Sequence, residues 1–123
     1  MSTLEPLVAH ECDARGIVTL TLNRPQAFNS LSEAMLDALQ SALERVATDE
    51  SARVVVIAAA GKAFCAGHDL KEMRAEPSLD YYERLFAQCA RMMLTIQRLP
   101  QPVIARVHGI ATAAGCQLVA MCD

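Results

Sequence analysis

The sequence predicts an α/β fold with a parallel sheet element, and two observations support that prediction. A strand pattern, a helix pattern and a second strand pattern follow one another along residues 17–58, which is the order of a parallel strand pair. A short loop of small residues then leads from a strand into a helix twice, at 61–69 and at 109–115. This recurrence suggests a superhelical repeat of βα units, although the letters themselves do not repeat.

The composition is that of one globular domain. The chain has 123 residues, of which 53% are hydrophobic and 20% are charged, so it can bury one modest core. The net charge is −3 and no basic run occurs, which argues against nucleic acid as a partner. No apolar run reaches the ~18 residues of a membrane span. Residues 1–6 carry no secretion or organelle pattern and the 5 cysteines form no CxxC pair, so we expect a cytoplasmic protein.

The first expected elements are a β-hairpin and a helix. Residues 7–12 and 17–22 alternate between apolar and polar side chains on either side of a turn at 13–16. Ser30, followed three residues later by Glu33, predicts a capped helix start. The buried stripe of that helix is expected to hold Leu31, Met35, Leu36, Leu39, Leu43 and Val46.

The remaining elements follow in order along the chain. Residues 54–58 form a continuous apolar run, typical of a strand covered on both faces. Asp69 is placed to cap the next helix. The elements expected after it are a short helix over 70–75, a long helix from Ser78 to Leu99, a strand over 103–107 and a helix over 114–122. The buried stripe of the long helix is expected to hold Tyr82, Leu85, Phe86, Cys89, Met92, Met93, Ile96 and Leu99.

The two small-residue loops are candidate sites for an anion or an oxyanion. Ala66 and Gly67 leave the backbone uncovered, so a ligand atom can approach a main-chain N–H group. Residues 109–116 have the same character. Backbone donors that stabilise a developing negative charge need small neighbours, which explains this composition without any catalytic side chain.

At these loops the sequence resembles the crotonase superfamily, the enoyl-CoA hydratase/isomerase family. Four segments match that family in order and spacing across nearly the whole chain. Within the family, the run from Ala111 to Leu118 is most similar to that of the enoyl-CoA hydratase domain-containing type 3 proteins. The matching segments are Asn23-Arg24-Pro25 with Asn29, residues 62–73, residues 102–105 and residues 109–123.

The resemblance implies a ββα superhelix, with residues 1–123 as the N-terminal part of a single acyl-CoA-binding domain whose C-terminal part is absent. It implies an acyl-CoA thioester as the ligand, no cofactor or metal, and a trimer or hexamer for the full-length form. Two backbone N–H groups of the family hold the thioester oxygen, and they match Ala66 and Ala114. The residues that match the CoA-contacting segments are Arg24, Gln26, Ala27, Ala66, Gly67, His68, Asp69 and Leu70.

One position departs from the family pattern. The first of the family's two catalytic glutamates would stand at Gln117, and a glutamine cannot act as a general base at neutral pH. The second would lie beyond Asp123. Three functions therefore stay open: a hydratase or isomerase of fatty acid metabolism, a non-catalytic acyl-CoA-binding or regulatory protein, and an inactive truncated fragment. The 123 residues alone are expected to be inactive.

Several residues also allow other hypotheses. His68 and Glu72 have the i, i+4 spacing of metal ligands, but no third ligand is apparent. Cys65 or Cys116 would need a paired histidine to act as a nucleophile. Gln117 could orient a water or a substrate carbonyl, or have no chemical role.

Overall fold

The computed structural model describes residues 5–123 and contains a four-stranded sheet with strand order β1-β2-β3-β4. The strands are β1 (Val8–Cys12), β2 (Ile17–Leu22), β3 (Val54–Ala59) and β4 (Val103–Ala105). The β1–β2 pair is antiparallel, whereas β2–β3 and β3–β4 are parallel. The predicted mixed α/β fold, with its N-terminal hairpin, is therefore confirmed. Residues 1–4, part of the segment assessed for targeting patterns, lie outside the described residues.

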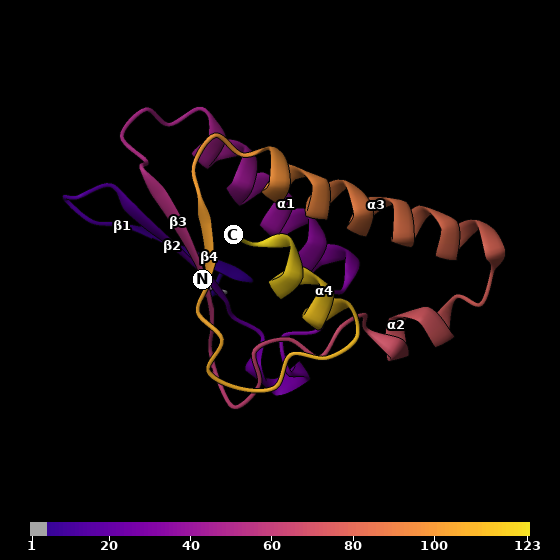
Figure 1. Cartoon of the computed structure of the whole chain (residues 1–123). Helices are drawn as coiled ribbons and strands as arrows, with labels where there is room; N and C mark the ends of the chain where they lie inside the picture. The colour runs from indigo at the N-terminus through magenta and orange to yellow at the C-terminus, as the bar shows by residue number, and fades with distance from the viewer. Residues whose placement is uncertain (1–4) are drawn as a thin grey trace, which may run out of the picture.

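The helices lie on one side of the sheet (Figure 1). They are the 3₁₀ helix η1 (Pro25–Ala27), α1 (Glu33–Ala47), α2 (Leu70–Ala75), α3 (Leu79–Arg98) and α4 (Ala114–Met121). The long helices α1 and α3 pack on each other, and α4 packs on α3. Asp69 caps α2 and Ser78 caps α3, both as predicted.

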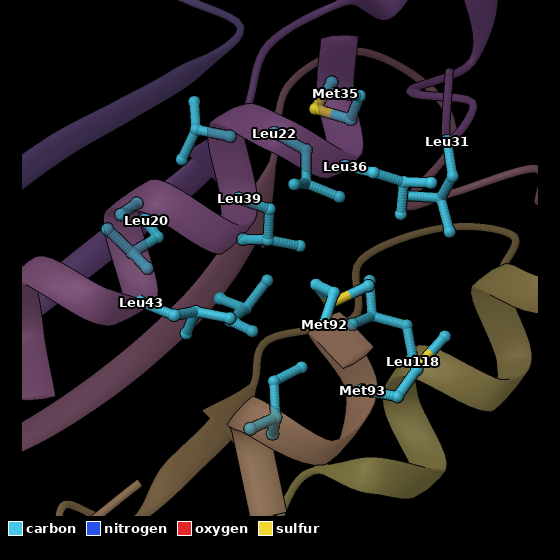
Figure 2. Close-up of a cluster of buried hydrophobic side chains, with 14 of the residues drawn as sticks. Leu20, Leu22, Leu31, Met35, Leu36, Leu39, Leu43, Met92, Met93 and Leu118 are labelled. Atoms are coloured by element: carbon cyan, nitrogen blue, oxygen red, sulfur yellow. The ribbon is translucent and has the colours of Figure 1, made fainter. Parts of the chain in front are cut away.

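The core lies between the sheet and the helices α1, α3 and α4 (Figure 2). Strand β2 shows why: its apolar residues Val18, Leu20 and Leu22 are fully buried, and they alternate with half-buried positions. Strand β3 alternates in the same way from Val54 to Ile57, since Val54 and Val56 are half-buried, but Ala58 on their face is buried. Within the described residues, the expectation of a strand covered on both faces is therefore wrong at Val54 and Val56 and met at Ala58.

The start of α1 differs from the prediction. Ser32, rather than Ser30, is the N-cap, because its Oγ accepts a hydrogen bond from the Met35 N–H (3.1 Å). Leu31 is buried but stays extended, since its N–H donates to the Gly67 carbonyl (2.7 Å). A tertiary hydrogen bond to the first small-residue loop thus competes with the local capping pattern and determines where the helix begins.

The buried face of α3 also differs from the prediction. Tyr81 is 2% exposed, whereas Phe86 is 48% exposed. The Tyr82 ring is half-buried, and its hydroxyl donates to the Met73 carbonyl (3.0 Å). The strand expected over 103–107 ends at Ala105.

Candidate functional site

The two small-residue loops pair with each other where β3 and β4 end. Cys65 and Ala111 form a parallel bridge. In it the Cys65 N–H donates to the Ile110 carbonyl and the Thr112 N–H donates to the Cys65 carbonyl, both at 3.1 Å. Segments almost fifty residues apart in the sequence therefore build one site.

Two glycines make this close approach possible. A Cβ atom on Gly115 would overlap the Cys65 carbonyl oxygen. A Cβ atom on Gly67 would lie 3.2 Å from the Ala114 nitrogen, and Gly67 has a φ of +90°, which favours glycine. The glycines therefore bring the backbone of one loop against the backbone of the other.

The second loop enters α4 through a strained residue. Ala113 has φ 53° and ψ −126°, a sparsely populated conformation for alanine. Its carbonyl accepts hydrogen bonds from the N–H groups of Cys116 (3.0 Å) and Gln117 (3.1 Å). The Ala114 N–H, at the first position of the helix, makes no hydrogen bond to residues 5–123. It is one of the unpaired donors that every helix start presents.

In the first loop, the His68 N–H has no backbone partner among the described residues whereas the Ala66 N–H has one, and His68, unlike Ala66 and Gly67, lines a cavity. The Ala66 N–H donates to the Phe28 carbonyl (3.1 Å), which contradicts the prediction that Ala66 is a free donor. Phe28 has a left-handed φ of 54°. A match to the family's sequence motif at Ala66 does not reveal the direction of the Phe28 carbonyl. The His68 N–H makes no hydrogen bond within the described part of the chain.

His68, Ala114 and Gln117 line one cavity of about 400 Å³ between the first loop, α3 and α4. The rest of its lining is apolar or small and consists of Phe86, Cys89, Ala90, Met93 and Ala113. No charged side chain is among the residues that line it. The cavity thus has two backbone donors and two neutral polar side chains in an apolar setting, which is the usual make-up of a small-molecule site.

The loop before α1 supports the first small-residue loop. The Asn29 side chain is fully buried. Its Oδ1 accepts a hydrogen bond from the Arg24 N–H (2.8 Å), and its Nδ2 donates to the carbonyls of Ala60 (2.8 Å) and Ala63 (3.1 Å). Asn29 matches the family pattern, but no role could be predicted for it from the sequence, and the structure shows that it ties two loops together.

Arg24 and Asp69 form an ion pair of 2.9 Å. The other Asp69 oxygen accepts a hydrogen bond from the Glu72 N–H (3.1 Å) at the start of α2. Burial alone would raise the pKa of Asp69, but the Glu72 N–H and the Arg24 guanidinium outweigh it and lower the pKa below its ordinary value. Two of the predicted CoA-contacting residues are therefore paired with each other.

The other predicted CoA-contacting residues lie on the same two segments. Gln26 is exposed and Ala27 is half-buried, both on η1. Leu70, the first residue of α2, is 68% exposed. A parallel bridge between Leu31 and His68 holds the two segments together.

The structure gives no support to the metal or cysteine hypotheses. The Glu72 carboxylate accepts a hydrogen bond from the Glu33 N–H (2.9 Å), and residues 5–123 contain no cluster of three potential metal ligands. Burial raises the pKa of Cys65, so its thiol stays protonated, while Cys116 is exposed. Within the same residues, no helix is both long and apolar enough to cross a membrane.

A mixed sheet with two βα loops that meet at one cavity defines the N-terminal portion of a crotonase-type α/β fold. The family model described as enoyl-CoA hydratase/isomerase matches residues 13–123. The chain therefore belongs to the enoyl-CoA hydratase/isomerase family.

Individual relatives agree with this assignment. A crystal structure of an enoyl-CoA hydratase from Mycobacterium smegmatis is 76% identical with a TM-score of 0.95, over 97% of this chain and 46% of that one. The structure of human enoyl-CoA hydratase domain-containing protein 3 is 44% identical with a TM-score of 0.89, over 95% of this chain and 46% of that one. The Xenopus laevis protein of that name is 50% identical over 88% of this chain and 37% of its own length. The predicted similarity to type 3 proteins is confirmed.

Two further points follow from the relatives. The chain spans less than half the length of each of these three proteins. The vertebrate type 3 proteins are named mitochondrial, which contradicts the expectation of a cytoplasmic protein.

Proposed function

We propose that this protein binds an acyl-CoA thioester at the cavity between the two loops and stabilises the enolate form of that thioester. The N–H groups of His68 and Ala114 donate to the thioester oxygen. The observation that supports this is that both donors are unpaired within residues 5–123 and that both residues line one cavity. In comparable sites, the loss of one such donor costs about 3 kcal/mol of transition-state stabilisation.

The CoA portion is proposed to run along η1 and the start of α2. Arg24, Gln26 and Ala27 contact it from one segment, and Gly67 to Leu70 from the other. Arg24 keeps 31% of its side chain exposed beside Asp69, so its guanidinium can contact a phosphate without leaving the ion pair.

Gln117 occupies the place of the first catalytic glutamate in this proposal. A neutral amide there orients a water or a carbonyl but removes no proton. We therefore expect slow hydration of enoyl thioesters, with isomerase chemistry dependent on a second acid. The neutrality of Gln117 also favours a second candidate, a protein that binds acyl-CoA without turning it over.

We further propose that residues 1–123 form the N-terminal part of one acyl-CoA-binding domain that assembles as a trimer or hexamer. Experiments on this protein therefore use the full-length protein that the gene encodes, called the full gene product.

Calorimetry with crotonyl-CoA and a hydration assay test the proposal. The unaltered full gene product should bind crotonyl-CoA but hydrate it slowly, and Gln117→Glu should increase the hydration rate. Gln97→Glu is the matched control, because Gln97 is exposed on α3 and does not line the cavity. Absence of thioester binding would refute the proposal, and fast hydration by the unaltered protein would refute the role given to Gln117. Exchange of the α-protons of a bound acyl-CoA in D₂O separates the enzyme from the binding protein.

A further inference from the structure

Helix α2 is held in place mainly by polar contacts. None of its 6 residues is buried, and within α2 only Met73 packs against the core, where it stays half-buried. The helix lies at the N-terminal end of α3 (Figure 1). A helix with so few buried apolar contacts has little stability of its own, so its polar contacts decide where it lies.

The first of these contacts is made by the Glu72 carboxylate, which caps a different helix. Its Oε1 accepts a hydrogen bond from the Glu33 N–H (2.9 Å), and Glu33 is the first residue of α1. An N–H group at that position has no partner within its own helix, and the positive end of the helix dipole favours a carboxylate there. Glu72 therefore holds α2 against the start of α1.

Tyr81 of α3 adds the second contact. Tyr81 is buried, and its hydroxyl donates a long hydrogen bond to the Glu33 Oε2 (3.4 Å). Burial, followed by the charges of Glu72 and Glu33, raises the pKa of Tyr81 to about 12, so the hydroxyl keeps its proton and stays a donor beside both carboxylates. Without this hydroxyl, two like charges would lie near each other with no donor between them, and they would push α2 away from α1.

The start of α1 also holds the peptide group that carries the His68 N–H. The Leu31 N–H donates to the Gly67 carbonyl (2.7 Å), and Leu31 and His68 form a parallel bridge. The Gly67 carbonyl and the His68 N–H belong to one planar trans peptide group, so they point in opposite directions. The segment just before α1 therefore sets the direction of the His68 N–H.

The His68 ring is held by packing. It lies edge-on against Phe86, with 5.2 Å between the ring centroids and 61° between the planes. Its Nδ1 is enclosed and has no hydrogen-bond partner among the described residues. The direction of the backbone N–H thus depends on the polar contacts on either side of His68, which are the Gly67 carbonyl before it and the Glu72 carboxylate after it.

We propose that Glu72 and Tyr81 are positioning residues for the thioester site, because they fix α2 on the start of α1 and so keep the His68 N–H directed at the thioester oxygen. The inference rests on the proposed function, since it concerns the donor named there. Neither side chain lines the cavity. Glu72 is four residues after His68, so a displacement of α2 reaches the His68 peptide group directly.

The carbonyl stretching frequency of isotope-labelled butyryl-CoA bound to the full gene product tests the inference. The unaltered protein should lower this frequency relative to the free thioester. Glu72→Ala should reverse roughly half of the shift, since one of two donors is misdirected, and should weaken binding about fivefold, as for one net hydrogen bond. Glu72→Gln keeps an acceptor oxygen and should retain most of the shift. Tyr81→Phe keeps the ring in the core and should reverse part of the shift, so it tests the inference even if Glu72→Ala fails to fold.

Two control variants separate positioning from a loss of stability. Val46→Ala removes buried methyl groups at the other end of α1, so it should lower the urea midpoint without changing the frequency. Glu76→Ala removes an exposed carboxylate at the end of α2, and it should change neither the stability nor the frequency.

The possible outcomes separate the inference from the function beneath it. A full shift in both Glu72→Ala and Tyr81→Phe would overturn the inference and leave thioester binding intact. A shift that is reduced equally by Val46→Ala would also overturn it, because loss of stability would then explain the effect. If the unaltered protein does not bind butyryl-CoA, or binds it without a shift, the proposed function and the inference both fail.

Discussion

Adding one methyl group at Gly115 tests how closely the two loops must approach. Replacing a glycine inside a helix by alanine usually stabilises it by about 0.5–1 kcal/mol. Gly115 is buried in the first turn of α4, and its new Cβ would overlap the Cys65 carbonyl oxygen and lie 2.8 Å from the carbonyl carbon. Because these backbone atoms cannot rotate away, an overpacking cost of about 1–3 kcal/mol exceeds the gain. We expect a net loss of about 1–2 kcal/mol.

The assay is urea unfolding of the full gene product, followed by far-ultraviolet circular dichroism and compared at constant m value. Cys116→Ala is the matched control, since Cys116 is exposed on the same turn of α4, and it should change stability by less than about 0.5 kcal/mol. Displacement of α4 also moves the Ala114 N–H away from His68, so thioester affinity should fall together with stability. A Gly115→Ala protein that is as stable as the unaltered one would refute the described contact between the loops.

Three other substitutions test the supports of the site. Asn29→Ala removes the three hydrogen bonds of a buried side chain and should cost about 2–4 kcal/mol in urea unfolding, whereas Asn23→Ala should cost much less; equal losses would contradict this. Asp69→Asn should destabilise the protein at neutral pH but not in acid. The folded pKa of Asp69 lies below its ordinary 3.8, so its ion pair with Arg24 contributes above that pH and is lost as the pH falls through the folded value; a pH-independent difference would argue against it. Ala113→Gly should relieve the strain of the positive φ of 53° and increase the free energy of unfolding by up to about 1 kcal/mol, which would appear as a higher urea midpoint. A lower midpoint would mean that the strain is absent.

Local patterns predicted the elements wherever local interactions decide them. The alternation of Ile17–Leu22 and the capping residues Asp69 and Ser78 all have the predicted roles, because each depends on neighbours within a few residues. Ser30 failed as a cap because a distant carbonyl, that of Gly67, holds the following N–H. The periodicity of the sequence does not reveal this hydrogen bond, because it joins residues that are far apart in the chain.

The site was predicted as two loops but not as individual donors. Small residues marked two loops whose backbones approach each other closely, since such an approach requires them. The Ala66 N–H is not the free donor that was predicted, because it donates to the Phe28 carbonyl, and the unpaired N–H of His68 stands two residues further along. The unpaired Nδ1 of His68 could not be found from the sequence either, because it depends on packing against Phe86 of α3.

The central claim is that the N–H groups of His68 and Ala114 hold a thioester oxygen, and the carbonyl stretching frequency of a bound, isotope-labelled acyl-CoA tests it most directly. Two hydrogen bonds should lower that frequency relative to the free thioester. Replacing Ala114 by lactic acid, which puts an ester oxygen in place of the N–H, should reverse part of the shift. The same replacement at Ala66 should leave the shift unchanged, because that N–H donates to Phe28. A shift that disappears with the Ala66 replacement and survives the Ala114 replacement would contradict the account.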